Sequence, residues 1–186
     1  MNEQADDWGI LSQLPGNPLM WVLILSEMLV FGALFVAFAV MRLLHPAMFL
    51  AGQASLDVAL GGLNTLVLVT SGYLAARAVQ VRTVAGSRAS LPWLGGAMTL
   101  GACFLAIKAS EYADKAAHGL GIETNGFYTL FYLMTGFHAL HVVMGIIVLG
   151  IVGWKNSVEN LETGAAFWHM VDLIWLILFP LVYLLR

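Results

Sequence analysis

The sequence predicts an all-α polytopic membrane protein, a bundle of five transmembrane helices. Apolar residues make up 60 % of the chain and charged residues only 10 %, against roughly 45–50 % and 25 % in soluble globular proteins. Five stretches are also apolar enough to cross a hydrocarbon core about 30 Å thick, which takes roughly 20 residues of helix. Because lipid offers no hydrogen bonds to peptide groups, these segments are expected to be helices rather than strands.

The membrane domain is expected to cover residues 19–186, after an N-terminal cytoplasmic or interfacial segment of residues 1–18. The five expected spans are residues 19–41, 57–79, 91–113, 125–154 and 163–185. Trp8–Leu14 is mildly apolar, and Pro15-Gly16-Asn17-Pro18 separates it from the first span. Pro18 suits a helix start, since its missing N–H would be unpaired there anyway.

Composition also excludes several classes of protein. With 11 acidic residues, 8 lysines and arginines and a net charge of −3, the chain is not a polybasic nucleic-acid binder. Its single cysteine, Cys103, excludes an internal disulfide and a C-x-x-C motif. Lysines and arginines divide evenly between the two sides of the membrane, but Arg77, Arg82 and Arg88 gather on the side of the N-terminus. The positive-inside rule then predicts a cytoplasmic N-terminus and a periplasmic C-terminus.

Glu27 is the first ionisable residue expected inside the membrane. It lies eight residues beyond Leu19, or about 12 Å along a helix. A charge at mid-membrane costs roughly 2.5–3.5 kcal/mol on insertion scales, so such a residue is a functional hypothesis by default. Four roles are open for Glu27: a protonated carboxyl hydrogen-bonded inside the bundle, a proton carrier, a contact to a lipid headgroup, or a metal ligand.

Three histidines fall in the last two spans. His138 and His141 are three residues apart, so their imidazoles face much the same direction on a helix. In the last span, Asp172 either orients the ring of His169 or bonds with it across to the fourth span. These histidines with carboxylates are a chemically reasonable copper or non-haem iron set. A di-iron bundle is disfavoured because the chain has no E-x-x-H motif. Hydrogen-bonded structural histidines are the favoured interpretation.

Three further patterns follow from helical spacing. The second span carries small and hydrogen-bonding residues on one face, which favours close helix packing over a substrate path. These residues are Gly61, Asn64, Thr65, Ser71, Gly72 and Ala75. In the last span, Trp168, Asp172 and Trp175 form one stripe. Lys108, Glu111 and Lys115 are helix neighbours near the end of the third span, and the expectation for them is a solvated helix terminus without chemistry.

The motifs resemble, in order, those of subunit III of haem-copper oxidases. They are Ser26-Glu27-x-x-x-Phe31, Leu63-Asn64-Thr65 with Ser71-Gly72, Glu111-Tyr112, Thr135-Gly136-Phe137-His138-x-x-His141-Val142, and Trp168-His169-x-x-Asp172-x-x-Trp175 with Tyr183. Many members of that family have seven spans, and this chain is similar to the five-helix type of cytochrome o ubiquinol oxidase. Its beginning, from Pro15 to Glu27, is most similar to the subunit III homologues associated with nitric oxide reductase.

The resemblance implies a non-catalytic accessory subunit of a terminal oxidase or nitric oxide reductase in the bacterial inner membrane. Such a subunit binds no metal or cofactor itself, and haem and copper belong to the catalytic subunit I. It is expected to stabilise subunit I, to support proton uptake and to bind phospholipid. The residues expected at a lipid or subunit interface, or as buried polar groups, are Glu27, Asn64, Glu111, His138, His141, Trp168, His169 and Asp172.

The two missing spans change one part of that expectation. In seven-span members a lipid cleft lies between the first two helices and the rest, so here it is absent or filled by another subunit, and Glu27 then serves subunit contact. Two other functions are weighed against the accessory role. One is an independent metal-binding redox protein that uses His138, His141 and His169. The other is a small transporter or proton channel that uses Glu27, although the chain shows no inverted repeats or broken helices.

Overall fold

A computed structural model describes residues 18–155 and 157–185, and every element in this part of the chain is helical. The predicted segment 1–18 therefore lies outside the described residues, except for Pro18. The elements are α1 (Pro18–Leu44), α2 (Pro46–Ala54), α3 (Val58–Ala85), α4 (Ser87–Ala117), α5 (Gly126–Lys155), α6 (Val158–Phe179) and the π-helix η2 (Pro180–Leu184). All but α2 and η2 are long and apolar enough to span a membrane, with η2 completing the last span. The predicted all-α membrane bundle is confirmed.

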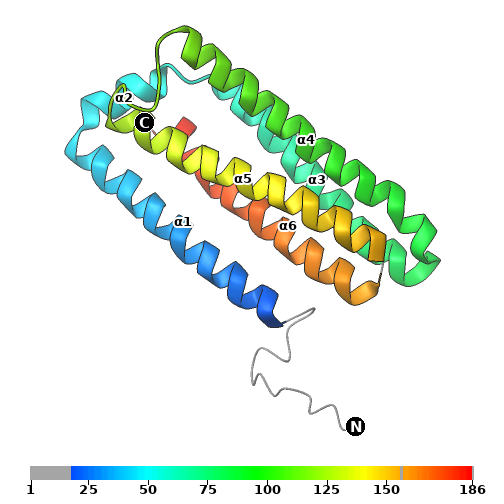
Figure 1. Ribbon diagram of the computed structural model, residues 1–186. Helices are drawn as coiled ribbons and strands as arrows, with labels where there is room; N and C mark the ends of the chain where they lie inside the picture. Colours follow the sequence, from blue (N-terminus) through cyan, green and yellow to red (C-terminus); the bar gives the residue numbers. More distant parts are fainter. Residues whose placement is uncertain (1–17, 156, 186) are drawn as a thin grey trace.

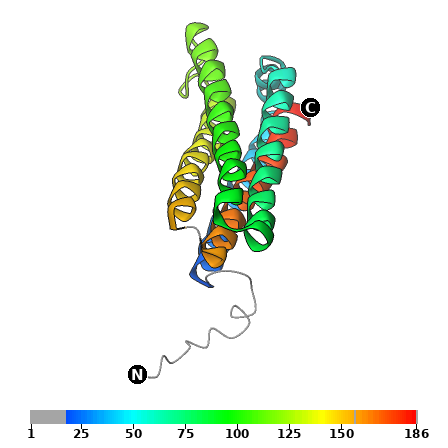
Figure 2. The same ribbon diagram turned by 90° about the vertical axis from the view of Figure 1, so that its right-hand side faces the viewer.

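The long helices alternate in direction between two ends of the bundle. At the first end, α1 begins, α3 passes into α4, and α5 passes into α6 (Figures 1 and 2). At the second end, α1 passes into α2, and the C-terminus lies close to them (Figure 1). Among the five spans, the one formed by α6 and η2 is the most buried and α1 is the least. The last span therefore forms the core, and α1 lies at the outside, against α5 and α6.

Polar side chains define where two of the helices start. The Asp57 side chain accepts a hydrogen bond of 3.0 Å from Leu60 N, so α3 starts at Val58. Ser157 caps α6 in the same way through Asn160 N, at 3.2 Å, so α6 starts five residues before the expected position 163. Gly86 separates α3 from α4 with a φ of 87°, a value that glycine adopts without strain.

The short helix α2 was not predicted. It begins with Pro46 and buries Phe49, whose ring centroid lies 5.1 Å from that of Phe38 and 5.5 Å from that of Phe127. Its Gln53 Nε2 donates hydrogen bonds of 2.9 Å to the carbonyl oxygens of Val182 and Leu185. Helix α2 thus ties together the end of α1, the start of α5 and the end of the chain.

Candidate functional site

Helix α3 packs closely on the last span through its predicted small and polar face. Trp168 Nε1 donates to Ser71 Oγ at 3.1 Å, and Trp175 Nε1 donates to Thr65 Oγ1 at 2.9 Å. Each indole N–H is therefore satisfied by a hydroxyl of α3, which matters in lipid because no water replaces a missing partner. The interpretation of this face as a packing surface is confirmed. Asn64 is also buried, and its Nδ2 donates to Phe104 O at 3.4 Å.

Glu27 of α1 points into the bundle and meets His141 of α5. The Glu27 Oε2 and His141 Nε2 atoms lie 3.0 Å apart, with exposed side-chain fractions of 20 % and 6 %. The oxygen is not aligned as an acceptor from the ring, so the contact is a close pair rather than a well-formed hydrogen bond. His141 Nδ1 lies 2.8 Å from Phe137 O. Because a carbonyl only accepts, His141 Nδ1 carries a proton and donates it to Phe137 O. His141 Nε2 and the Glu27 carboxyl then attract each other through a second proton, carried by either the ring or the carboxyl.

His138 corrects the expectation of hydrogen-bonded structural histidines. Its side chain is completely buried, and neither ring nitrogen has a hydrogen-bond partner among the described residues. Aromatic rings surround it instead, with centroid distances of 5.5 Å to Phe104, 5.2 Å to Trp175 and 6.4 Å to Phe31. The spacing correctly placed both histidines on one face of α5, since Phe31 contacts the two rings. Of these two histidines, however, only His141 has a polar side chain of another helix beside it among the described residues, namely Glu27 of α1.

The cluster of Lys108, Glu111 and Tyr183 contradicts the expected solvated terminus. Lys108 is 2 % exposed, Glu111 is 5 % exposed, and Lys115 is also buried. Lys108 Nζ donates to Glu111 Oε2 at 2.7 Å and to Tyr183 OH at 3.0 Å, and Tyr183 OH donates to Glu111 Oε1 at 2.8 Å. The reason is tertiary: η2 covers this stretch of α4 from the far end of the chain.

Aromatic rings complete the surroundings of the Lys108 ammonium. Its Nζ lies 5.0–5.6 Å from the ring centroids of Tyr112, Phe131, Trp175 and Tyr183. Such cation–π contacts contribute about 2 kcal/mol or more when they are desolvated. The cluster is therefore a satisfied charge pair in an aromatic cage. It fixes α4 to the last span.

A second polar network links α2, α4 and α5 near the same end of the bundle. Lys115 Nζ donates to Ser55 O at 2.6 Å, and the hydroxyls of Ser55 and Tyr128 lie 2.8 Å apart. The hydroxyls of Tyr112 and Thr135 are 2.6 Å apart. These contacts join the loop after α2 to α4 and α5, so the polar groups of this end are used for cohesion.

His169 and Asp172 form a third polar pair, which faces α3. His169 Nδ1 lies 3.6 Å from Asp172 Oδ2, and the exposed side-chain fractions are 45 % and 10 %. Of the two alternatives left open by the sequence, the structure supports Asp172 as the residue that orients His169. A Cβ atom at Gly72 would overlap the Asp172 carboxylate, so a glycine in α3 is what lets the pair approach.

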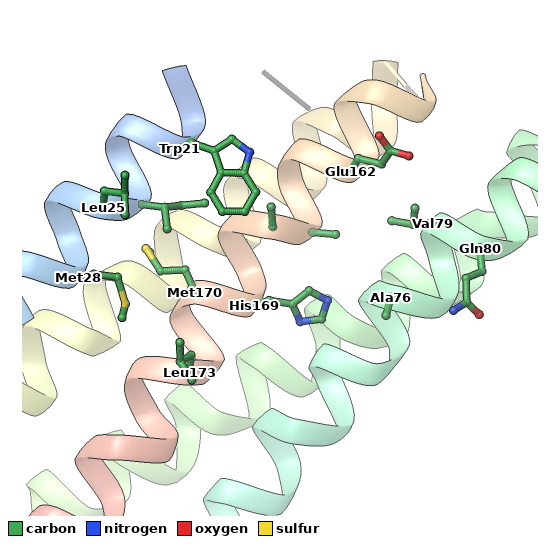
Figure 3. Close-up of a pocket in the computed structure, with 13 residues that line it drawn as sticks. Trp21, Leu25, Met28, Ala76, Val79, Gln80, Glu162, His169, Met170 and Leu173 are labelled. Atoms are coloured by element: carbon green, nitrogen blue, oxygen red, sulfur yellow. The ribbon is translucent and has the colours of Figure 1, made fainter. Parts of the chain in front are cut away.

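A groove opens beside this pair, between α1, α3 and α6. Its volume is about 700 Å³, and its lining is mostly apolar. Trp21, Leu25 and Met28 project into it from α1, while His169 projects from α6 toward α3 (Figure 3). Gln80 and Glu162 lie at its rim near the first end of the bundle (Figure 3).

The ionisable residues gather in pairs, and in the described part of the chain no three His, Cys, Asp or Glu side chains converge as a metal site requires. Glu27 meets His141, while His169 meets Asp172 on the α3 side of the last span. The arrangement therefore does not support the alternative of an independent metal-binding redox protein.

Comparison with known proteins identifies the family. Residues 17–186 match the family described as cytochrome c oxidase subunit III. The chain belongs to this family. It is an accessory subunit III of a haem-copper oxidase, and it is a multi-pass membrane protein.

Individual relatives agree with this assignment. The chain is 36 % identical over 176 residues to cytochrome c oxidase subunit 3 of Thermostichus vulcanus, which covers 88 % of this chain and 84 % of that one. It is 28 % identical to cytochrome bo(3) ubiquinol oxidase subunit 3 of Pseudomonas putida over 89 % of this chain and 83 % of that one. A protein of Aeropyrum pernix named heme-copper oxidase subunit I+III is 28 % identical over 89 % of this chain and 22 % of its own length.

Sequence reasoning missed several residues that the structure places in polar clusters. Lys108 stands three residues before Glu111 beyond a long apolar run, and that spacing was the available signal for a buried pair. Gln53 gave no signal, because a single glutamine near a loop is ordinary on a surface.

Proposed function

We propose that this subunit III packs against the catalytic subunit I, which carries the haem and copper, and stabilises it in a bacterial cytoplasmic membrane. The observation that carries the proposal is the Aeropyrum pernix relative, in which one polypeptide bears the names of both subunits. Fusion of subunits I and III in one polypeptide supports the proposal that the two subunits also contact each other when they are separate chains. The relatives are named as oxidase subunits, which favours an oxidase over a nitric oxide reductase as the host complex.

The proposed contact surface is the outward face of α1. Leu29, Val36 and Leu43 are 74 %, 63 % and 82 % exposed, and their spacing of seven residues places them along one side of the helix. Glu27 lies on the opposite side of α1, with its carboxyl turned inward to His141. Since α1 is the least buried span, it has the most surface left for a partner.

Co-purification tests the proposal. The tagged chain, isolated in a mild detergent, is expected to bring down a larger subunit with a haem absorption spectrum. Leu29→Trp with Val36→Trp is expected to lower the haem recovered per tagged chain. The matched control is Leu140→Trp, on an exposed position of α5. Isolation of the chain without any haem protein in several detergents would contradict the proposal.

We propose further that the first end of the bundle faces the cytoplasm. Arg77, Arg82, Arg88 and Lys155 lie toward that end. At the opposite end Lys108 is buried and paired, which lowers the count of free cations there and supports the orientation. A C-terminal alkaline phosphatase fusion is expected to be active and a C-terminal green fluorescent protein fusion dark. The reverse pattern would overturn the orientation.

A hollow near the second end is our candidate for phospholipid binding. It has a volume of about 490 Å³ and is lined by apolar residues of α1, α2 and η2 together with Arg42. A guanidinium beside an apolar hollow suits a lipid phosphate with its acyl chains. Arg42→Gln is expected to reduce the phospholipid retained by the purified complex, measured by native mass spectrometry. Arg88→Gln is the control, and equal retention in both variants would contradict the assignment.

For proton uptake we propose the pair of Glu27 and His141. The pair is an ionisable contact between α1 and α5, and the Glu27 side chain keeps an exposed fraction of 20 %. Glu27→Gln is expected to slow proton uptake by the assembled complex during turnover, measured with a pH-sensitive dye. Glu159→Gln, on the exposed start of α6, is the control. An unchanged uptake rate in Glu27→Gln would remove the pair from this role.

A further inference from the structure

The groove between α1, α3 and α6 has polar groups at two depths. Gln80 and Glu162 lie near the first end of the bundle, and His169 lies deeper (Figure 3). His169 is eleven residues beyond the start of α6 at Val158, or about 16 Å along the helix axis. The pair of His169 and Asp172 therefore lies within the hydrocarbon layer, with apolar lining above it and below it.

The pair is built in a way that presents one nitrogen. His169 Nδ1 lies 3.6 Å from Asp172 Oδ2, which is longer than a hydrogen bond, and the carboxylate is the polar neighbour of that nitrogen. In the neutral tautomer with its proton on Nδ1, toward the carboxylate, Nε2 is an acceptor, and no described residue hydrogen-bonds it. Asp172 Oδ1 is also buried without a partner among the described residues. Gly72 provides the space in which the carboxylate lies. A half-exposed imidazole, with a carboxylate beside its Nδ1, thus lies in a mostly apolar groove and has Nε2 available for a hydrogen bond.

The charge of the lining disfavours an anionic ligand. The lining contains the acid Glu162 but, among the described residues, no lysine or arginine. Arg77 of α3 does not itself line the groove: its guanidinium lies 5.5 Å from the Trp93 ring of α4, and its Nη1 donates to Oε1 of the lining residue Gln80 at 2.9 Å. A phosphate at the depth of His169 would be desolvated without a cation, which is costly. An uncharged head that bears a hydroxyl meets no such cost.

We propose that this groove binds an uncharged amphiphile whose hydroxyl head donates to His169 Nε2 and whose apolar tail lies along Leu25, Met28 and Leu173. An isoprenoid quinol of the bilayer has this chemistry. Pockets of this kind, mostly apolar with a few placed polar groups, are typical of small-molecule sites. The inference goes beyond the accessory role.

The test is photolabelling of the assembled complex in nanodiscs with a reduced, azide-bearing short-tail ubiquinone analogue. Labelled peptides are identified by mass spectrometry, so that a site on this chain is distinguished from any quinol site on a partner. Label is expected on the α1 peptide around Met28 and on the α6 peptide around Met170 and Leu173. Excess unlabelled decylubiquinol is expected to abolish the labelling of these peptides. Excess phosphatidylglycerol or phosphatidylethanolamine is expected to leave the labelling unchanged.

Two variants act on the groove in different ways. His169→Leu removes the acceptor, and loss of one hydrogen bond is expected to reduce the labelling by roughly three- to tenfold. Leu173→Trp fills the groove and leaves the polar pair, and it is expected to reduce the labelling as well. His118→Leu, at an exposed histidine outside the groove, is the control and is expected to label as the unmodified complex does.

The proposal is overturned if the unmodified complex carries no label on α1 or α6, or if phospholipid displaces the label. Equal labelling in His169→Leu and the unmodified complex also overturns it. Haem content per tagged chain is measured for each sample, so a failure of the groove proposal is separate from a failure of the complex to assemble.

Discussion

Replacement of Lys108 by methionine tests the account of the buried charge pair. The substitution keeps a long apolar side chain within the aromatic cage but removes the ammonium. Glu111, which is 5 % exposed, then keeps only the hydroxyl of Tyr183 as a donor in the cluster. Removal of one partner of a buried ion pair costs about 3–5 kcal/mol, because the other charge stays buried without compensation.

The size of the effect is measurable as a melting temperature. For a chain of 186 residues, 1 kcal/mol shifts the melting temperature by about 2–4 °C, so Lys108→Met is expected to lower it by roughly 6–20 °C. The assay is thermal unfolding of the purified chain in a mild detergent, followed by tryptophan fluorescence, since Trp175 borders the cage. Lys155→Met, at an exposed lysine, is the matched control, with an expected change of less than about 1 kcal/mol.

A double variant separates the loss of a charge from the loss of packing. In Lys108→Met with Glu111→Leu no charge is left buried, and the double variant is expected to be more stable than Lys108→Met alone. The reasoning is refuted if Lys108→Met unfolds at the same temperature as the unmodified chain. It is also refuted if the double variant is less stable than either single variant, because packing would then outweigh the charge.

Four other substitutions test neighbouring conclusions in the same unfolding assay. His138→Phe is expected to leave the melting temperature unchanged or raised, because the ring keeps its aromatic neighbours and loses two unpartnered polar atoms. His141→Phe leaves Glu27 without its pair and is expected to lower the melting temperature. A lower melting temperature in His138→Phe than in His141→Phe would contradict our description of these histidines. Gln53→Ala removes the hydrogen bonds to the C-terminal carbonyls and is expected to cost about 1–3 kcal/mol, with faster proteolysis of the last turn; equal protease resistance would argue against the tie between α2 and η2. Tyr183→Phe removes a donor to a buried carboxylate and is expected to cost about 1.5–3 kcal/mol, and a smaller loss than in an exposed Tyr73→Phe control would contradict it.

The spans and the packing face of α3 could be predicted because both depend on local sequence. Apolar length and the need to satisfy peptide groups in lipid are properties of each segment alone. Small residues on one helical face, such as Gly61 and Gly72, identify a close approach before the partner helix is known. The start of α6 was misplaced by five residues because apolar length does not report the cap that Ser157 supplies.

The polar clusters depend on which segments meet, and the sequence alone did not determine that. Lys108 and Glu111 stand near the end of a helix in sequence, yet Tyr183, 75 residues away, covers them and makes their charges a buried pair. His138 and His141 are both histidines on the same face of α5, but among the described residues only His141 lies beside a carboxyl group of another helix, that of Glu27. The sequence by itself determined a five-helix subunit III with costly polar groups in its membrane spans. Only the tertiary structure decided which of those groups are partnered, since the free energy of a buried charge depends on its neighbours in space.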